Sequence, residues 1–198
     1  MYQRSYSLME IKRCLEASEQ IPLNEFTQGH GIERHSSISD VQLRARAMNK
    51  GTSVSAFAKG RLADQFHSVA FLLNSSYGQQ ALQVLDFLDG NLVETKKGNA
   101  VTRVAVTGSI ETGSFPKAGA RFAHSQGPLG TAEQVKAEKM TVVLELKPRG
   151  FPAPLYIVTA FPQPSCKPNR IEPTLQQAKN WNDKAEEAVG LSISRLFS

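Results

Sequence analysis

The chain has 198 residues, of which 40% are hydrophobic and 21% are charged, a balance that is ordinary for globular proteins. Its formal net charge of +5 at pH 7 favours an anionic partner, such as RNA or an acidic protein. No apolar run is long enough to span a membrane, and the first residues lack the basic-then-apolar pattern of a signal peptide. Cys14 and Cys166 lack the spacing of a metal site or a disulfide framework, so we expect free thiols, with one long-range disulfide as the alternative.

The first half of the chain predicts helices, from apolar residues at helical spacing and from capping residues at helix starts. These helices cover residues 4–20, a short stretch after Ser39, residues 56–73 and residues 79–89. Ser7 and Glu10 have the spacing of a capping box. Ser39 is suited to cap the second helix, which places His35 in the loop that leads into it.

The second half predicts strands. Val101, Val104 and Val106 lie in a β-branched stretch, which is typical of a strand. Residues 114–139 contain Gly, Pro and Lys with few apolar side chains, so we expect a long exposed loop. Residues 140–146 then alternate in polarity and are followed by a turn and a returning strand at 155–161, which predicts an antiparallel hairpin.

The last part of the chain predicts a linker and a helix. Four prolines between positions 162 and 173 indicate a stiff linker, and Thr174 is suited to cap a helix that runs to about Val189. Helices therefore come first, strands second, and one C-terminal helix is appended. This order predicts an α+β fold in which the N-terminal helices pack on an antiparallel sheet.

The segment from His30 to Arg46, HGIERHSSISDVQLRAR, contains two histidines and three arginines. Histidine transfers protons near neutral pH, and the guanidinium group binds phosphate. Metal-free cleavage of RNA needs a base for the ribose 2′-OH, an acid for the leaving 5′-oxygen, and cations around the charge on phosphorus. His35, Arg46 and a hydroxyl from the strand hairpin would meet these needs. The alternative interpretation is a solvated basic helix behind a polar loop.

Other chemistries find less support. The sequence has no GxSxG motif and no phosphate-cradling glycine motif, and neither cysteine has a histidine nearby. His30 and His35 are not at the i, i+4 spacing of helical zinc ligands. We interpret His67 as a partly buried helix residue and His124 as an exposed loop residue. We therefore expect neither a metal nor a cofactor.

Two motifs resemble those of a known family. GHGIERHSSISDVQLRAR resembles the opening motif of the RNase A-like toxin domains at the C-termini of bacterial contact-dependent inhibition proteins and related polymorphic toxins. The matching positions are His30, Arg34, His35, Ser39, Leu43 and Arg46, while Ser36-Ser37-Ile38 replaces the Val-Gly-Lys of the motif. Residues 157–162, IVTAFP, are similar to the closing strand V-x-T-A-Y-P of that family. The resemblance covers about residues 29–164.

The resemblance implies a set of site residues. The catalytic histidine of the family falls on His35, its phosphate-binding arginine on Arg46, and its strand threonine on Thr159. The tyrosine of the family falls on Phe161, which has no hydroxyl to donate. Three residues are candidates for the missing proton donor: His30, Arg44 and Tyr156.

The resemblance also implies a fold and a function. It implies an RNase A-like fold with a curved sheet, in which residues 1–28 are an N-terminal helix and lead-in, residues 29–164 the toxin domain, and residues 165–198 a proline-containing linker and C-terminal helix. It implies metal-independent cleavage of RNA, with tRNA as a candidate substrate, to a 2′,3′-cyclic phosphate. It further implies an acidic immunity protein, no membrane insertion, delivery by a larger toxin or secretion system, and action in the target-cell cytoplasm.

Two alternatives stay open at this point. In the first, the change to Phe161 has weakened catalysis, and an RNase A-like scaffold acts as an RNA- or protein-binding module. Trp181 and the apolar face of the last predicted helix would suit a partner helix. In the second, a different toxin nuclease has a rearranged site that uses His30.

Overall fold

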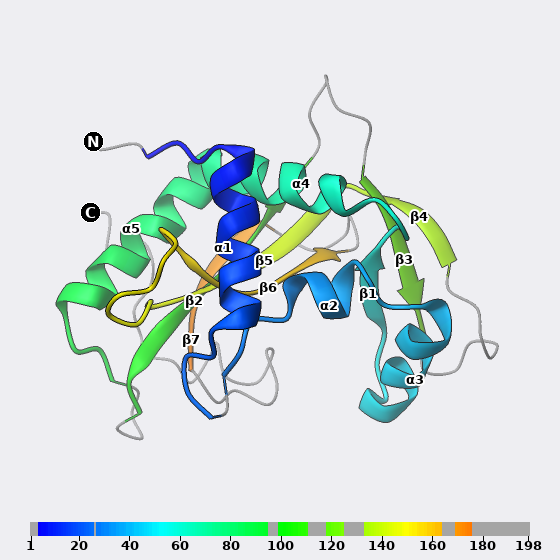
Figure 1. The fold of residues 1–198 in the computed structure, drawn as a ribbon, viewed down its shortest axis with the longest axis horizontal. Coiled ribbons are helices and arrows are strands. Elements are labelled where there is room, and N and C mark those ends of the chain that lie inside the picture. Colours follow the sequence, from blue (N-terminus) through cyan, green and yellow to red (C-terminus); the bar gives the residue numbers. More distant parts are fainter. Residues whose placement is uncertain are drawn as a thin grey trace.

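The computed structural model of the chain describes residues 4–25, 27–94, 99–110, 118–124, 133–163 and 169–175. Its elements, in chain order, are α1 (Leu8–Gln20), α2 (Gly31–His35), α3 (Asp40–Lys50), β1 (Val54–Phe57), α4 (Leu62–Asn74), α5 (Ser76–Gly90), β2 (Val101–Ser109), β3 (Ala118–Ala123), β4 (Glu133–Ala137), β5 (Lys139–Glu145), β6 (Tyr156–Gln163) and β7 (Arg170–Leu175). Helices dominate the first half and antiparallel strands the second (Figure 1), so the predicted α+β class is confirmed.

The strands form two antiparallel sheets. The larger has the order β6-β5-β2-β7, and the smaller has the order β1-β3-β4. Helices α1, α4 and α5 pack against the larger sheet, and α2 lies beside β6 (Figure 1). Their apolar side chains form the main core with residues such as Val104, Val142 and Ile157. Helix α3 packs on the smaller sheet through a separate cluster that includes Leu43 and Ala56.

The predicted hairpin is confirmed as β5 and β6. Thr141 pairs with Phe161 and Val143 pairs with Thr159, so these four side chains share one face of the sheet. A bulge shifts the register next to Val143, but the alternation from Thr159 to Phe161 is regular. The two candidate positions of the closing strand therefore point to the same side, away from the main core.

The capping box predicted at Ser7 and the N-cap predicted at Ser39 are confirmed, and Ser39 also forms a capping box, with Gln42. Ser7 and Ser39 each accept a hydrogen bond from the third helical amide, and the side chain of that third residue accepts one in return from the cap. The prediction that His35 lies in a loop is wrong, because His35 is the last residue of the one-turn helix α2. His30 is the N-cap residue of this helix. A single turn is too short to give a periodic signal in the sequence.

The exposed loop predicted at residues 114–139 is also wrong, since its described part contains β3 and β4. The predicted helix at 56–73 likewise begins later than expected, at Leu62, after strand β1. Arg121 explains part of the error. This residue is 2% exposed in the middle of β3, where a charged side chain disguises the strand pattern.

The stiff linker predicted near the C-terminus is wrong in its described part, which forms strands. Residues 170–173, expected in a linker, and residues 174–175, expected to begin the last helix, form β7 and pair with β2. Pro162, also expected in the linker, lies within β6. Both β6 and β7 are edge strands, where the missing amide of a proline is tolerated. Thr174 belongs to β7, and the helix expected up to Val189 lies outside the described residues. The division of the chain into three domains remains a prediction.

The N-terminal helix is part of the main core. Ile11, Cys14 and Leu15 are fully buried, and α1 packs against β6. Cys14 is a buried free thiol, whereas Cys166 lies outside the described residues. None of the helices within the described ranges has both the length and the apolar character needed to cross a bilayer.

Candidate active site

The edge of β6 that does not pair with β5 is covered by three other elements. Because β6 ends the larger sheet, its outward-facing backbone carbonyls need partners from outside the sheet. Three of them accept hydrogen bonds: Val158 from the His30 amide at 2.9 Å, Ala160 from Gln65 Nε2 at 3.1 Å, and Pro162 from Ser55 Oγ at 2.6 Å. Helix α2, helix α4 and strand β1 are thereby tied to the strand that carries Thr159 and Phe161.

Helix α2 has only five residues and needs support from its surroundings, because so short a helix is unstable alone. Its N-cap residue, His30, makes no side-chain capping bond. Glu19 of α1 takes that role, since its carboxylate accepts hydrogen bonds from the amides of Ile32 and Glu33, the latter at 3.0 Å. The positions of His30 and His35 are therefore set by neighbouring elements as well as by α2 itself.

His35 is buried, with 6% of its surface exposed. Its Nδ1 lies 2.8 Å from the carbonyl oxygen of Ser55, and its ring stacks on Phe161 with the centroids 5.2 Å apart. Since a carbonyl oxygen can only accept, Nδ1 carries the proton and donates it, and the lone pair is on Nε2. Nε2 is therefore the nitrogen of His35 that is able to accept a proton.

Both histidines of the segment are neutral at pH 7. Burial lowers the pKa of His35 to about 3, and the positive charge of Arg46 adds to the effect. Burial also lowers the pKa of His30 to about 4, together with the charge of Arg34. The two imidazole rings have centroids 6.2 Å apart, and His30 Nδ1 lies 3.2 Å from the carbonyl oxygen of Gln28. Two neutral imidazoles thus lie side by side.

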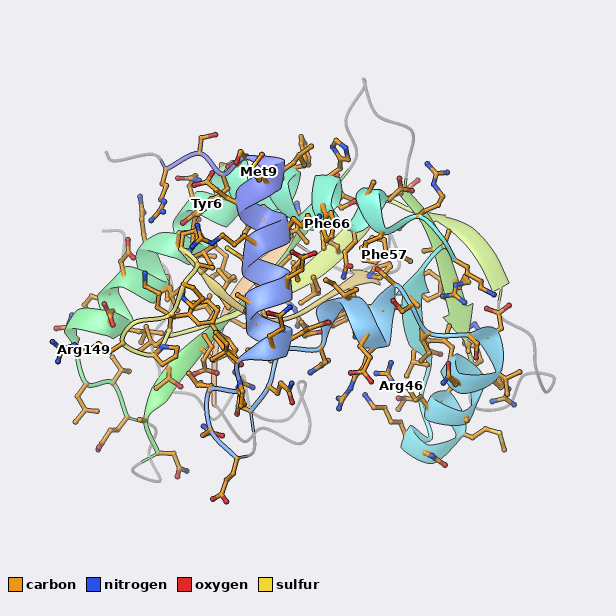
Figure 2. The ribbon with its side chains drawn as sticks, viewed as in Figure 1. Tyr6, Met9, Arg46, Phe57, Phe66 and Arg149 are labelled. Atoms are coloured by element: carbon orange, nitrogen blue, oxygen red, sulfur yellow. The ribbon has the colours of Figure 1, made fainter. Side chains whose placement is uncertain are left out.

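A group of cations lies next to these rings. Arg46 donates from Nη1 to the carbonyl oxygen of Arg34 at 2.8 Å, and Figure 2 shows its side chain between α2 and α3. Lys50 follows Arg46 by one helical turn, and its pKa is lowered by partial burial and by the charges of Arg46 and Arg34. None of the three forms an ion pair with a carboxylate of the described residues. Burial lowers the pKa of Arg46, while the carboxylate of Glu33 acts to raise it and so offsets part of this positive charge, and the excess that remains favours a bound anion.

Thr159 contributes an unpaired hydroxyl. The residue is 4% exposed, and its Oγ1 has no hydrogen-bond partner among the described residues. A buried hydroxyl without a partner carries a desolvation cost, which a ligand that bonds to it would remove. On the neighbouring strands of the same face, Thr141 and Thr107 bond each other at 2.7 Å, and Gln163 Nε2 donates to Thr141 at 3.0 Å. Of these three threonines, Thr159 is the one whose hydroxyl has no partner among the described residues.

The other candidate donors lie apart from this arrangement. Tyr156 is fully buried at the opposite end of β6 from Phe161, and its hydroxyl donates to the carbonyl of Ile21 at 3.1 Å. Burial raises its pKa. Arg44 is 5% exposed. It projects from a different side of α3 than Arg46, because the two residues are two positions apart in a helix. Of the three candidates, the structure brings only His30 beside His35.

The two remaining histidines are placed as expected. His67 is partly buried on α4, and His124 is exposed after β3, where its Nδ1 lies 2.6 Å from Ser53 Oγ. No group of three or more His, Cys, Asp or Glu residues in the described part of the chain is arranged to hold a metal ion.

Two buried residues that support the site were missed from the sequence. Arg121 donates to the Phe57 carbonyl at 2.9 Å, to the Ile38 carbonyl at 2.7 Å and to Asp40 at 2.6 Å, and so fixes the start of α3 to the smaller sheet. Gln65 bonds α2 to β6. For Arg121, the only indication in the sequence was its partner Asp40 in the first turn of a predicted helix. For Gln65 there was none, because a single glutamine in a helix does not indicate a buried contact.

The fold and the site together define an α+β protein with two antiparallel sheets and a histidine–cation cluster beside an edge strand. A solved structure that is similar to this chain is the crystal structure of the CdiA-CT/CdiI complex from Y. kristensenii 33638, with a TM-score of 0.38 and 15% sequence identity. The match covers 69% of this chain and 100% of that one. No protein-family model and no curated protein matches the sequence.

Proposed function

We propose that this chain is a metal-independent endoribonuclease that cleaves RNA by attack of the ribose 2′-OH on the adjacent phosphate. The observation that carries the proposal is the placement of His35. Its neutral imidazole has its lone pair on Nε2, and three cations, Arg34, Arg46 and Lys50, lie close by on α2 and α3, with the carboxylate of Glu33 acting on Arg46. A base beside a phosphate-binding group is the combination that this reaction needs.

In the proposed reaction, His35 Nε2 accepts the proton of the 2′-OH while the 2′-oxygen forms a bond to phosphorus. The bond from phosphorus to the 5′-oxygen breaks, and that oxygen takes a proton, which leaves a 2′,3′-cyclic phosphate. Arg46 and Lys50 stabilise the negative charge that grows on the phosphoryl oxygens. Thr159 donates a hydrogen bond to the same group.

His30 is the proposed source of the second proton. In the absence of RNA it is neutral, because burial and the positive charge of Arg34 lower its pKa to about 4. A phosphate bound among Arg34, Arg46 and Lys50 opposes that charge and raises the pKa of the imidazoles. Substrate binding thus brings His30 towards the protonated form that a general acid needs.

The proposal is tested with the purified full chain and total RNA, with and without EDTA. We expect fragments that end in a 2′,3′-cyclic phosphate by mass spectrometry, at the same rate in both samples. A rate that falls to background with EDTA would show metal-dependent cleavage and would contradict the mechanism. Purified tRNA, as a second substrate, tests whether it is a preferred target.

We further propose that the ribonuclease is a toxin used in interbacterial competition by contact-dependent growth inhibition. The support is the pair of motifs that resemble the toxin family and the net charge of +5, which suits an acidic immunity protein. In this proposal a larger toxin or secretion system delivers the domain, which acts in the target-cell cytoplasm. Expression without an immunity partner should stop bacterial growth, and His35→Ala should restore it.

The second candidate function is a catalytically weakened RNase A-like scaffold that binds RNA or a protein. One observation favours it: Phe161 lacks the tyrosine hydroxyl and packs on His35, which is almost fully buried. The two functions are distinguished by combining a binding and a cleavage assay. A scaffold would retain RNA on a filter or in a gel shift and release no cyclic phosphate.

A further inference from the structure

Gln65 of α4 is fully buried and uses its amide on three partners. Its Nε2 donates to the carbonyl oxygen of Gly31 at 2.8 Å and to that of Ala160 at 3.1 Å. Its Oε1 accepts a hydrogen bond from Ser36 Oγ at 2.7 Å. A buried amide is costly unless it is bonded, and here both ends of the group are bonded.

The three partners are the sequence neighbours of the candidate site residues. Gly31 follows His30, and Ser36 follows His35, so Gln65 holds both ends of α2. Ala160 lies between Thr159 and Phe161 in β6. One side chain from a third element therefore connects the helix that carries the histidines to the strand that carries the threonine.

The packing around α2 makes this connection tight. A Cβ at Gly31 would lie 2.9 Å from Leu15 Cδ2 and 3.5 Å from the Ala160 nitrogen, so the backbone of α2 approaches β6 closely. A five-residue helix has little rigidity of its own. Its position relative to β6 consequently depends on bonds such as those of Gln65.

We propose that Gln65 is a positioning residue, which holds His30 and His35 at a fixed separation from Thr159 and Phe161. The kinetic part of this inference rests on the ribonuclease function proposed above, whereas the positioning itself does not. Gln65 touches no substrate and acts only through α2 and β6. A misplacement of catalytic groups by about 1 Å lowers turnover by as much as about 100-fold.

The test replaces Gln65 by methionine, which has a similar length and no hydrogen-bonding amide. Gln79→Met is the matched control, because Gln79 also bridges two backbone carbonyls, those of Arg4 and Leu73, from α5. Four quantities are measured on the full chain: kcat and KM for an RNA oligonucleotide, the melting temperature, and the pKa of the His35 imidazole by NMR titration.

We expect Gln65→Met to lower kcat by about 10- to 100-fold while KM stays within about twofold of the wild-type value. The pKa of His35 should rise from its low value towards 6.5, as a displaced ring gains access to water. Gln79→Met should change neither kcat nor the pKa of His35. If Gln65→Met lowers only the melting temperature and leaves kcat and the His35 pKa at wild-type values, the inference is wrong.

Ser36→Ala covers the case in which Gln65→Met does not fold. It removes one bond of the network with a small change in volume, and it should shift kcat and the His35 pKa in the same directions by a smaller factor. A folded Ser36→Ala protein with wild-type kcat and His35 pKa would overturn the inference. A wild-type chain that cuts no RNA would end the proposed function alone, because the NMR titration still reports where His35 lies.

Discussion

The imidazole of His35 stacks on the ring of Phe161, with the ring centroids 5.2 Å apart and the planes inclined by 26°. This contact joins the two sequence motifs, since His35 ends α2 and Phe161 lies in the last third of β6. The Phe161 ring covers one face of the imidazole, and the carbonyl oxygen of Ser55 accepts the hydrogen bond from its Nδ1. Nε2 is the nitrogen that remains for a substrate.

His35→Ala should abolish most RNA cleavage. General acid–base catalysis contributes about 100-fold or more, and alanine cannot accept the 2′-OH proton. Turnover of an RNA oligonucleotide is compared between the variant and the wild type, with circular dichroism as the check on folding. His124→Ala is the control, because that histidine is exposed and bonds Ser53, which directly precedes β1. Equal turnover in a folded His35→Ala protein would move the assignment to His30.

Arg46→Lys should lower turnover by about 100- to 1,000-fold, the usual effect of removing one donor that stabilises a developing charge. Lysine retains the charge but cannot grip two phosphoryl oxygens with a planar fork. The control is Arg149→Lys, since Arg149 is exposed in the β5–β6 turn and lies on the far side of the molecule from Arg46 (Figure 2). If both variants keep wild-type turnover, Arg46 is an ordinary surface charge.

The free energy of unfolding should fall as the pH is lowered from about 6.5. In the folded chain the pKa of His35 is about 3, whereas in the unfolded chain it is near its ordinary value of 6.5. Between these values the unfolded state binds a proton that the folded state does not, so stability decreases by up to about 1.4 kcal/mol per pH unit for this group. Urea titrations at pH 4 to 7 measure the slope.

His35→Asn should flatten that slope, because asparagine does not titrate. His30 contributes in the same direction, since its folded-state pKa is about 4. A double variant at both positions should therefore flatten the slope further. An unchanged slope in His35→Asn would mean that His35 is not buried as a neutral group.

How far the sequence predicts the structure depends on the length of each pattern. The capping box at Ser7, the N-cap at Ser39 and the β5–β6 hairpin were predicted because each rests on residues close in the chain. Helix α2 was not predicted, and the segment of strand β3, although Phe122 suggested a strand, was assigned to an exposed loop. The first is a single turn held by contacts from α1, α4 and β6, and the second has a buried arginine, Arg121, at its centre.

The same distinction applies to the candidate site. The two motifs identified His35, Arg46 and Thr159 as residues of interest, and the hairpin alternation indicated that Thr159 and Phe161 share a face. The pairing of His35 with the Ser55 carbonyl joins residues 20 positions apart, and the bond from Gln65 to Ala160 spans 95. Such contacts depend on the folded edge of β6 and have no local pattern.

Phe161→Tyr should raise turnover or leave it unchanged. The tyrosine of the toxin family is missing here, and one hydrogen bond to a charged group in the transition state is worth about 1.5–3 kcal/mol. That corresponds to roughly tenfold to a hundredfold in rate. Phe161 is partly exposed and pairs with Thr141 across the strands, on the face that also carries Thr159. The added hydroxyl should therefore point towards the same side as the threonine.

The measurement compares kcat of Phe161→Tyr and the wild type, together with their melting temperatures. Phe151→Tyr is the control, because that ring packs on Tyr156 at the other end of β6. A rise in kcat for Phe161→Tyr alone places the missing hydroxyl at the reacting phosphate. A large fall in melting temperature with loss of activity would instead show that the edge of the Phe161 ring is closed off by packing, so that an unbonded hydroxyl is buried there. In that case the substrate does not reach this part of β6, and the site would have to be built around His30 and the cations of α3.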